Sequence, residues 1–165
     1  MFIQIHSAAV QGIDCMPIRV EVDIAGSWPG FQIIGLPDTS IQEAKERIRT
    51  AWKNSGLEFP SNKRIVINLA PADLRKEGTA YDVPMALAMY LAQENILLDL
   101  SHSLFVGELA LDGSLRHSNG ILSIVLFAKA QGYKKIFIPE VNQKEASIVS
   151  GIDIFDELAL IVGAA

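Results

Sequence analysis

The residues of this sequence most suited to binding a ligand are a group of basic side chains. The 165-residue chain carries a net charge of −5, yet residues 45–76 carry +5 and the remainder carries −10. Lysine and arginine bind the phosphate oxygens of nucleic acids, and such an uneven distribution favours a surface that faces a polyanion. The alternative is an ordinary solvated surface. The candidate nucleic-acid-binding residues are Lys45, Arg49, Lys53, Lys63, Arg64, Arg75 and Lys76.

Two acidic residues in the same part of the chain are candidates for a subunit interface. Asp73 and Glu77 lie among these cations and could bind an arginine of a neighbouring subunit. The alternative is that segments 29–37 and 70–78, rich in glycine and proline, serve only to shape tight loops.

Several other kinds of site do not fit the sequence. The histidines (His6, His102 and His117) are isolated and Cys15 is the single cysteine, so we expect no metal site. The sequence contains neither a GxxxxGK[ST] phosphate loop nor a GxSxG nucleophile motif. We therefore expect no bound cofactor and no ATP hydrolysis in this chain.

Hydrophobic periodicity predicts the elements that position these residues. A helix from Asp38 or Thr39 to Ser55, followed by Gly56, would carry Lys45, Arg49 and Lys53 in one row. Asp82 fits the N-cap of a second, almost wholly apolar helix that contains Pro84. We expect strands at 2–5, 18–24, 31–34, 64–69, 104–111, 114–116, 135–139 and 152–155, a turn at 12–17, and helices at 120–131 and 142–150.

These elements indicate one α/β domain over residues 1–165, an α+β layered arrangement of helices packed on a mixed sheet. Half of the residues are hydrophobic, which suffices for a substantial core. No apolar run approaches the roughly 18 residues of a membrane span, and the first residues do not read as a secretory signal. We expect a cytoplasmic protein without a membrane partner. Residues 161–165 contain no stop signal, so we expect the chain to be part of a longer one.

Five segments carry a resemblance to a known family. They are residues 29–37 (PGFQIIGLP), 45–56, 68–78 (NLAPADLRKEG), 81–87 and 107–116. Together they resemble the N-terminal domain of the ComM/YifB proteins, which are bacterial AAA+ ATPases of the magnesium-chelatase-like group. The resemblance covers residues 1–150 and implies a Lon-protease-like fold with a left-handed βαβ crossover.

The resemblance also implies a function and its partners. ComM relatives are hexameric helicases that promote branch migration of DNA during natural transformation. The chain would then lack the ATPase module that follows this domain, and with it the ATP and magnesium that the module binds. Its partners would be that module, neighbouring subunits of the hexamer, and single-stranded or branched DNA. Its role would lie in ring assembly and DNA guidance.

Two further functions stay open beside this one. The domain could be a protein–protein adaptor for the ATPase, or a divergent Lon-like peptidase. Lon proteases use a serine–lysine pair, and the resemblance puts Ala80 at the serine position and Ile124 at the lysine position. Alanine offers no nucleophile and isoleucine accepts no proton, so we expect no catalytic residues. A shift of one residue brings in Thr79 and Ser123, still without a lysine.

Overall fold

The structure is a computed structural model that describes residues 1–156, so the closing residues 161–165 lie outside the described part. One seven-stranded sheet runs through it in the order β3-β4-β2-β1-β5-β8-β9, and β6 and β7 form a separate two-stranded sheet. The strands are β1 (Phe2–Gln11), β2 (Asp14–Ala25), β3 (Gly30–Ile34), β4 (Arg64–Ala70), β5 (Ser103–Phe105), β6 (Glu108–Leu109), β7 (Leu115–Arg116), β8 (Lys135–Phe137) and β9 (Asp153–Phe155). The α-helices are α1 (Thr39–Asn54), α2 (Asp82–Glu94), α3 (Ile121–Ala130) and α4 (Gln143–Ala146), the last preceded by a 3-10 turn, Glu140–Asn142.

The large sheet is mixed, as expected. The long β1–β2 hairpin is antiparallel and β2 is antiparallel to β4, whereas the other four neighbouring pairs are parallel. Alternation in Ile18–Ile24 fits this placement, because Ile18, Val20 and Val22 are fully buried.

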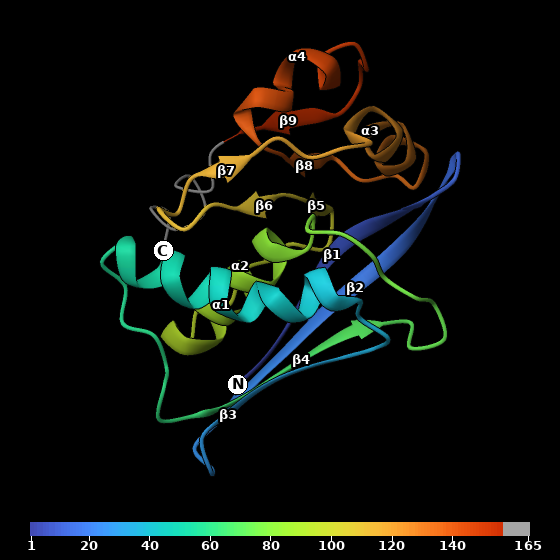
Figure 1. Cartoon of the computed structure of the whole chain (residues 1–165). Helices are drawn as coiled ribbons and strands as arrows, with labels where there is room; N and C mark the ends of the chain where they lie inside the picture. The colour runs from blue at the N-terminus through green and yellow to red at the C-terminus, as the bar shows by residue number, and fades with distance from the viewer. Residues whose placement is uncertain (157–165) are drawn as a thin grey trace.

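Helices cover the sheet on both faces (Figure 1). On one face, α1 and α2 pack with β1–β4 around a large apolar cluster that includes Ile48, Ile67 and Met85. On the other face, α3 and α4 pack against β5 and β8 around a smaller cluster. Adjacent residues of β5 point into different clusters, Phe105 into the first and Leu104 into the second. The sheet is therefore the middle layer of the described residues.

The crossovers on the two faces have opposite hands. Both β3–α1–β4 and β5–α3–β8 join parallel neighbours and advance toward the β9 edge, yet α1 and α3 cover opposite faces. The Val106 side chain points toward the α3 cluster, and its N–H donates to Phe137 O at 3.0 Å. When a strand of L-residues runs upward and a side chain points at the viewer, the N–H of that residue points to the right. Viewed from α3 with the strands running upward, β8 therefore lies to the right of β5. The α3 crossover is thus right-handed, as is usual, and the α1 crossover is left-handed, as the resemblance implies.

The expected boundaries of α1 are confirmed. Asp38 Oδ1 accepts a hydrogen bond from the Ile41 N–H at 2.8 Å, which caps the first turn, and Gly56 follows the helix with φ of +75°. The expected turn at 12–17 is too long, because β2 already begins at Asp14. Pro17 fits inside β2 since β4 pairs only with residues 19–25, so no ladder bond to β4 is lost there.

Two other expected elements are wrong. Asp82 does not cap α2; Tyr81 is the N-cap and Asp82 is the first helical residue, with its carboxylate engaged elsewhere. Residues 104–111 form two short strands in different sheets, because the chain bends at Gly107, whose N–H donates to Ala80 O at 2.8 Å. A Cβ at Gly107 would lie 2.8 Å from Val83 Cγ2, so any larger residue would have to displace the Val83 side chain.

Candidate functional site

The basic row on α1 exists as the spacing predicts. Lys45, Arg49 and Lys53 follow one another at four-residue intervals, with Arg49 and Lys53 exposed and Lys45 half-buried. Arg49 forms an exposed ion pair with Glu46 at 3.1 Å. Such a pair contributes about 0–1 kcal/mol and leaves the guanidinium free to exchange partners. The row is therefore accessible to a ligand.

Lys76 is a correction to the candidate set. Its side chain is fully buried, and its Nζ donates to Gly35 O at 2.9 Å and to Pro71 O. Burial lowers the pKa of this amine, which nevertheless ties the segment after β3 to the segment after β4. A buried amine that holds two carbonyl groups cannot reach a phosphate.

The segment that contains Lys76 also holds Arg75, Asp73 and Glu77. Arg75 Nε lies 3.2 Å from Glu77 Oε1, and both side chains are about 70% exposed, at 72% and 69%. Asp73 is exposed. Glu77 thus has an arginine partner within its own chain, and a role for either acidic residue at a subunit interface stays a prediction.

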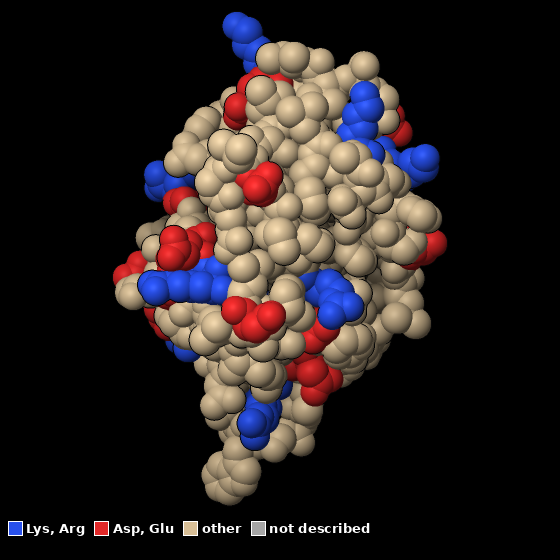
Figure 2. Space-filling view, turned by 90° about the vertical axis from the view of Figure 1, so that its right-hand side faces the viewer, with Lys and Arg blue, Asp and Glu red and all other residues tan. Residues whose placement is uncertain are grey.

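Arg49 and Lys63 meet at one cavity. This cavity of about 220 Å³ lies between β3, α1 and the connection from α1 to β4, and Phe31 and Phe59 also line it. Arg64 follows directly at the start of β4 and is exposed. The structure therefore brings three of the seven candidate cations to one end of the sheet. Elsewhere charge is mixed: on the face in Figure 2, basic and acidic side chains alternate without a continuous basic surface.

A second cavity, of about 210 Å³, contains both positions at which the resemblance places the Lon serine and lysine. Ala80, just before α2, and Ile124, in the first turns of α3, line it together with Ala8 and Val10 of β1. The two positions thus lie at one cleft, although 43 residues separate them in the sequence. Their side chains offer neither a nucleophile nor a proton acceptor.

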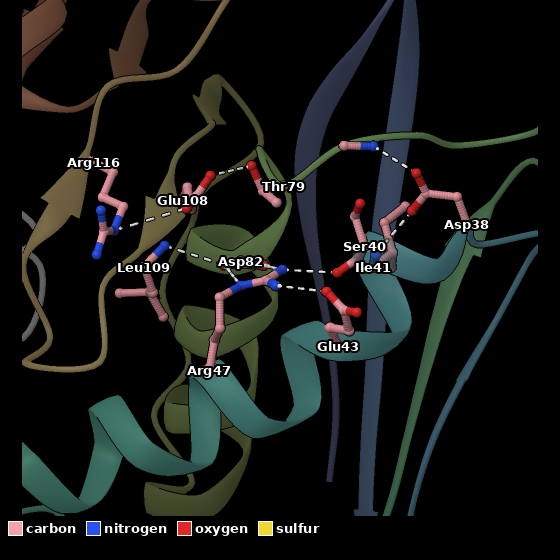
Figure 3. A network of polar contacts seen from close by, with 11 residues as sticks. Asp38, Ser40, Ile41, Glu43, Arg47, Thr79, Asp82, Glu108, Leu109 and Arg116 are labelled. Atoms are coloured by element: carbon pink, nitrogen blue, oxygen red, sulfur yellow. Dashed lines mark hydrogen bonds and ion pairs between the residues drawn. The ribbon is translucent and has the colours of Figure 1, made fainter.

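We call this cavity, lined by Ala80 and Ile124, the degenerate cleft. Its polar groups are arranged differently from a catalytic pair. Thr79 donates its hydroxyl hydrogen to the Glu108 carboxylate, which also faces Arg116 at 3.9 Å (Figure 3). Ser118 is buried, and its hydroxyl has no hydrogen-bond partner in the part of the chain that the structure describes. Within residues 1–156, no base contacts the Ser118 hydroxyl, and the acceptor for Thr79 is a carboxylate that also faces an arginine.

A separate ion pair between the half-buried Arg47 and the buried Asp82 joins three elements, and no sequence argument identified it. Arg47 of α1 binds Asp82 of α2 through two bonds, Nε to Oδ2 at 2.7 Å and Nη2 to Oδ1 at 3.0 Å (Figure 3). Nη2 also donates to Ser40 O at 2.8 Å, and Asp82 Oδ2 accepts from the Leu109 N–H of β6 at 3.2 Å. Burial raises the pKa of Asp82, while the bonds from Arg47 and Leu109 oppose the rise. The pair fixes α1, α2 and the β6–β7 hairpin together.

A weak signal for this pair is present in the sequence. Arg47 directly precedes Ile48 on α1 and thus borders its apolar face, and Asp82 begins an otherwise apolar helix. A charge at the border of a buried face needs a partner. Nothing in the spacing shows that α1 and α2 lie side by side, so the partner could not be named.

Among residues 1–156, no group of three or more His, Cys, Asp or Glu side chains could hold a metal ion. In the same range, no helix combines the length and the apolar character that crossing a bilayer requires.

Comparison with known proteins gives a consistent picture. Residues 20–142 match the family described as subunit ChlI of Mg-chelatase. The chain is 43% identical over 148 residues to YifB of Escherichia coli, covering 89% of this chain and 29% of YifB. It is 39% identical over 149 residues to the competence protein ComM of Haemophilus influenzae, covering 88% and 28%. A weaker match, 29% over 115 residues, is to Lon protease 2 of Bacillus subtilis, covering 70% and 20%. The chain thus spans less than a third of the length of these relatives.

Proposed function

Because this chain belongs to the family of subunit ChlI of Mg-chelatase and is similar to YifB and ComM, we propose that it is a non-catalytic domain of a DNA-processing AAA+ ATPase. In this proposal it assists ring assembly and guides DNA, and the longer protein is a hexameric branch-migration helicase in the cytoplasm. The domain comprises residues 1–165.

The observation that carries the proposal is the degenerate cleft. Ala80 and Ile124 line one cavity in a chain that is also similar to Lon proteases, so the two positions are juxtaposed without reactive groups. A peptidase needs an activated nucleophile, and none of the described residues offers a suitable base to the hydroxyls of Thr79 and Ser118. These features support a binding or assembly role over a hydrolytic one.

Nucleotide chemistry belongs, in this proposal, to residues beyond this chain. The sequence has no phosphate loop, so we assign the binding of ATP and magnesium to the ATPase module. What this chain supplies is a set of accessible cations, namely Lys45, Arg49, Lys53, Lys63, Arg64 and Arg75, which can bind phosphate oxygens.

Fluorescence anisotropy of single-stranded and forked DNA with this chain, at low and moderate salt, tests the proposal. We expect micromolar binding that weakens steeply as salt rises, since phosphate contacts release counterions. Absence of binding at low salt would remove the DNA-guiding role and favour the adaptor function. Cleavage of a peptide substrate would contradict both and favour a peptidase.

A further inference from the structure

The cavity at Arg49 and Lys63 combines two aromatic rings with two cations. The Phe31 and Phe59 ring centroids are 6.0 Å apart with 37° between the ring planes. The Arg49 guanidinium carbon lies 5.4 Å from the Phe59 ring centroid. Both phenylalanines are half-buried, so part of each ring is accessible from the cavity.

The walls of this aromatic–basic cleft are held in place from behind. Phe59 packs edge-on against Trp52 of α1, with ring centroids 5.8 Å apart and 83° between the planes. Trp52 Nε1 donates to Glu58 O at 3.2 Å, which fixes the connection beside Phe59. The Gly30 N–H donates to Lys63 O at 3.2 Å and joins the opposite wall to β3. A ligand would therefore enter a cleft that is already formed, which lowers the entropic cost of binding.

The charges at the cleft suit a phosphodiester. Arg49 and Lys63 line it and Arg64 is adjacent and exposed. Glu46 is the acidic partner of Arg49, but the two side chains are 73% and 50% exposed, so a phosphate can compete for the guanidinium. Glu58, which directly precedes Phe59 in the sequence, is exposed and does not line the cleft.

We propose that this cleft binds one nucleotide of single-stranded DNA, with its base against Phe31 and Phe59 and its phosphate at Arg49 and Lys63. The inference rests on the proposed function and specifies where and in what form DNA is held. An aromatic face adjoining cations stacks any base, whereas bases in a duplex are already stacked and are not available. The cleft therefore selects single strands over duplex and has little sequence preference.

The test uses the 165-residue chain and a short thymine-rich oligonucleotide with one 2-aminopurine, whose fluorescence reports unstacking and stacking of that base. Phe31→Leu keeps an apolar side chain on the edge strand β3 but removes the ring, and we expect about tenfold weaker binding. Lys63→Gln keeps the fold and should lower the salt slope by about 0.7. Lys53→Gln, one turn beyond Arg49 on the same helix, removes a candidate cation outside the cleft, and it measures the loss of binding expected from the charge alone.

The outcomes separate this inference from the function it rests on. Loss of the 2-aminopurine response in F31L, with K63Q weaker than K53Q, supports the cleft, as does tighter binding by Glu46→Gln. If DNA binds but F31L and K63Q match K53Q, the cleft inference is wrong and the DNA-guiding role stands. If a duplex of the same length binds as tightly as the single strand, stacking is not the mode of binding. If no DNA binds, both fail.

Discussion

Replacing Arg47 should show how strongly the free energy of unfolding depends on the ion pair between Arg47 and Asp82. In Arg47→Met the Asp82 carboxylate, which is 1% exposed, keeps one donor among the described residues, the Leu109 N–H at 3.2 Å. An uncompensated buried charge costs about 3–5 kcal/mol of unfolding free energy. Arg49→Met, two residues further along the same helix, removes an exposed pair and should cost less than about 1 kcal/mol.

A second variant separates the charge from the packing. Arg47→Met combined with Asp82→Leu removes both charges and leaves the Leu109 N–H without its acceptor, whereas Ser40 O keeps the hydrogen bond within α1. Unpaired backbone groups of this kind cost about 1–3 kcal/mol, so the double variant should be more stable than Arg47→Met alone. Urea unfolding followed by tryptophan fluorescence and circular dichroism measures all three values.

The pH dependence of Arg47→Met has a definite sign. Without the guanidinium, the pKa of the buried Asp82 carboxyl rises further above the value of about 3.9 in the unfolded chain. The folded state then binds this proton more tightly than the unfolded state, so stability falls as pH rises through the interval between the two pKa values. The deficit relative to the unmodified protein should shrink between pH 7 and pH 5. Equal costs for Arg47→Met and Arg49→Met, or a deficit that is constant with pH, would refute this account of the pair.

Substitutions at three other positions test the packing of the loops and of the degenerate cleft, and one further substitution is a control; urea unfolding measures the stability of each variant. Lys76→Met leaves the Gly35 and Pro71 carbonyls without this donor and should lower the free energy of unfolding by about 2 kcal/mol. The salt dependence of DNA binding should stay unchanged. A reduced salt slope would place Lys76 among the phosphate contacts. Gly35→Ala puts a Cβ 2.2 Å from Leu69 O at a φ of +96° and should lower the free energy of unfolding by more than about 3 kcal/mol. Gly26→Ala is the control, because a Cβ there meets open space, and it should cost under about 1 kcal/mol. Similar costs for the two variants would contradict the close approach of Gly35 to Leu69. Ser118→Ala removes a buried hydroxyl that has no partner among residues 1–156, and it should be neutral or stabilise by about 1 kcal/mol. A clear loss of stability would mean that this hydroxyl has a partner.

Most elements could be predicted because their signals are local. Alternation marks β2, and Asp38 and Gly56 mark the two ends of α1 by cap chemistry. The split of residues 104–111 could not be predicted, because the bend depends on contacts of Gly107 with Ala80 and Val83, which are far away in the sequence.

The candidate site shows the same division. Spacing on one helix predicted the accessible row of Arg49 and Lys53. Spacing could not show that Lys76 turns inward, since its two acceptors come from loops that only the sheet brings together. It also could not pair Arg47 with Asp82, because that contact requires α1 and α2 to share one face.

The two apolar clusters share one set of strands, and this has a consequence for cooperativity. β5 and β8 contribute alternate side chains to both clusters, Leu104 and Ile136 on one face and Phe105 and Phe137 on the other. Loss of α3 and α4 would uncover Leu104 and Ile136 without detaching the strands that the first cluster also holds. Opening of the α3–α4 layer is thus a local event below global unfolding, and native-state hydrogen exchange should show α3 amides exchanging at lower free energy than those of β1 and β2. The β1–β2 hairpin would then be the last part to open, and its opening would make global unfolding all-or-none.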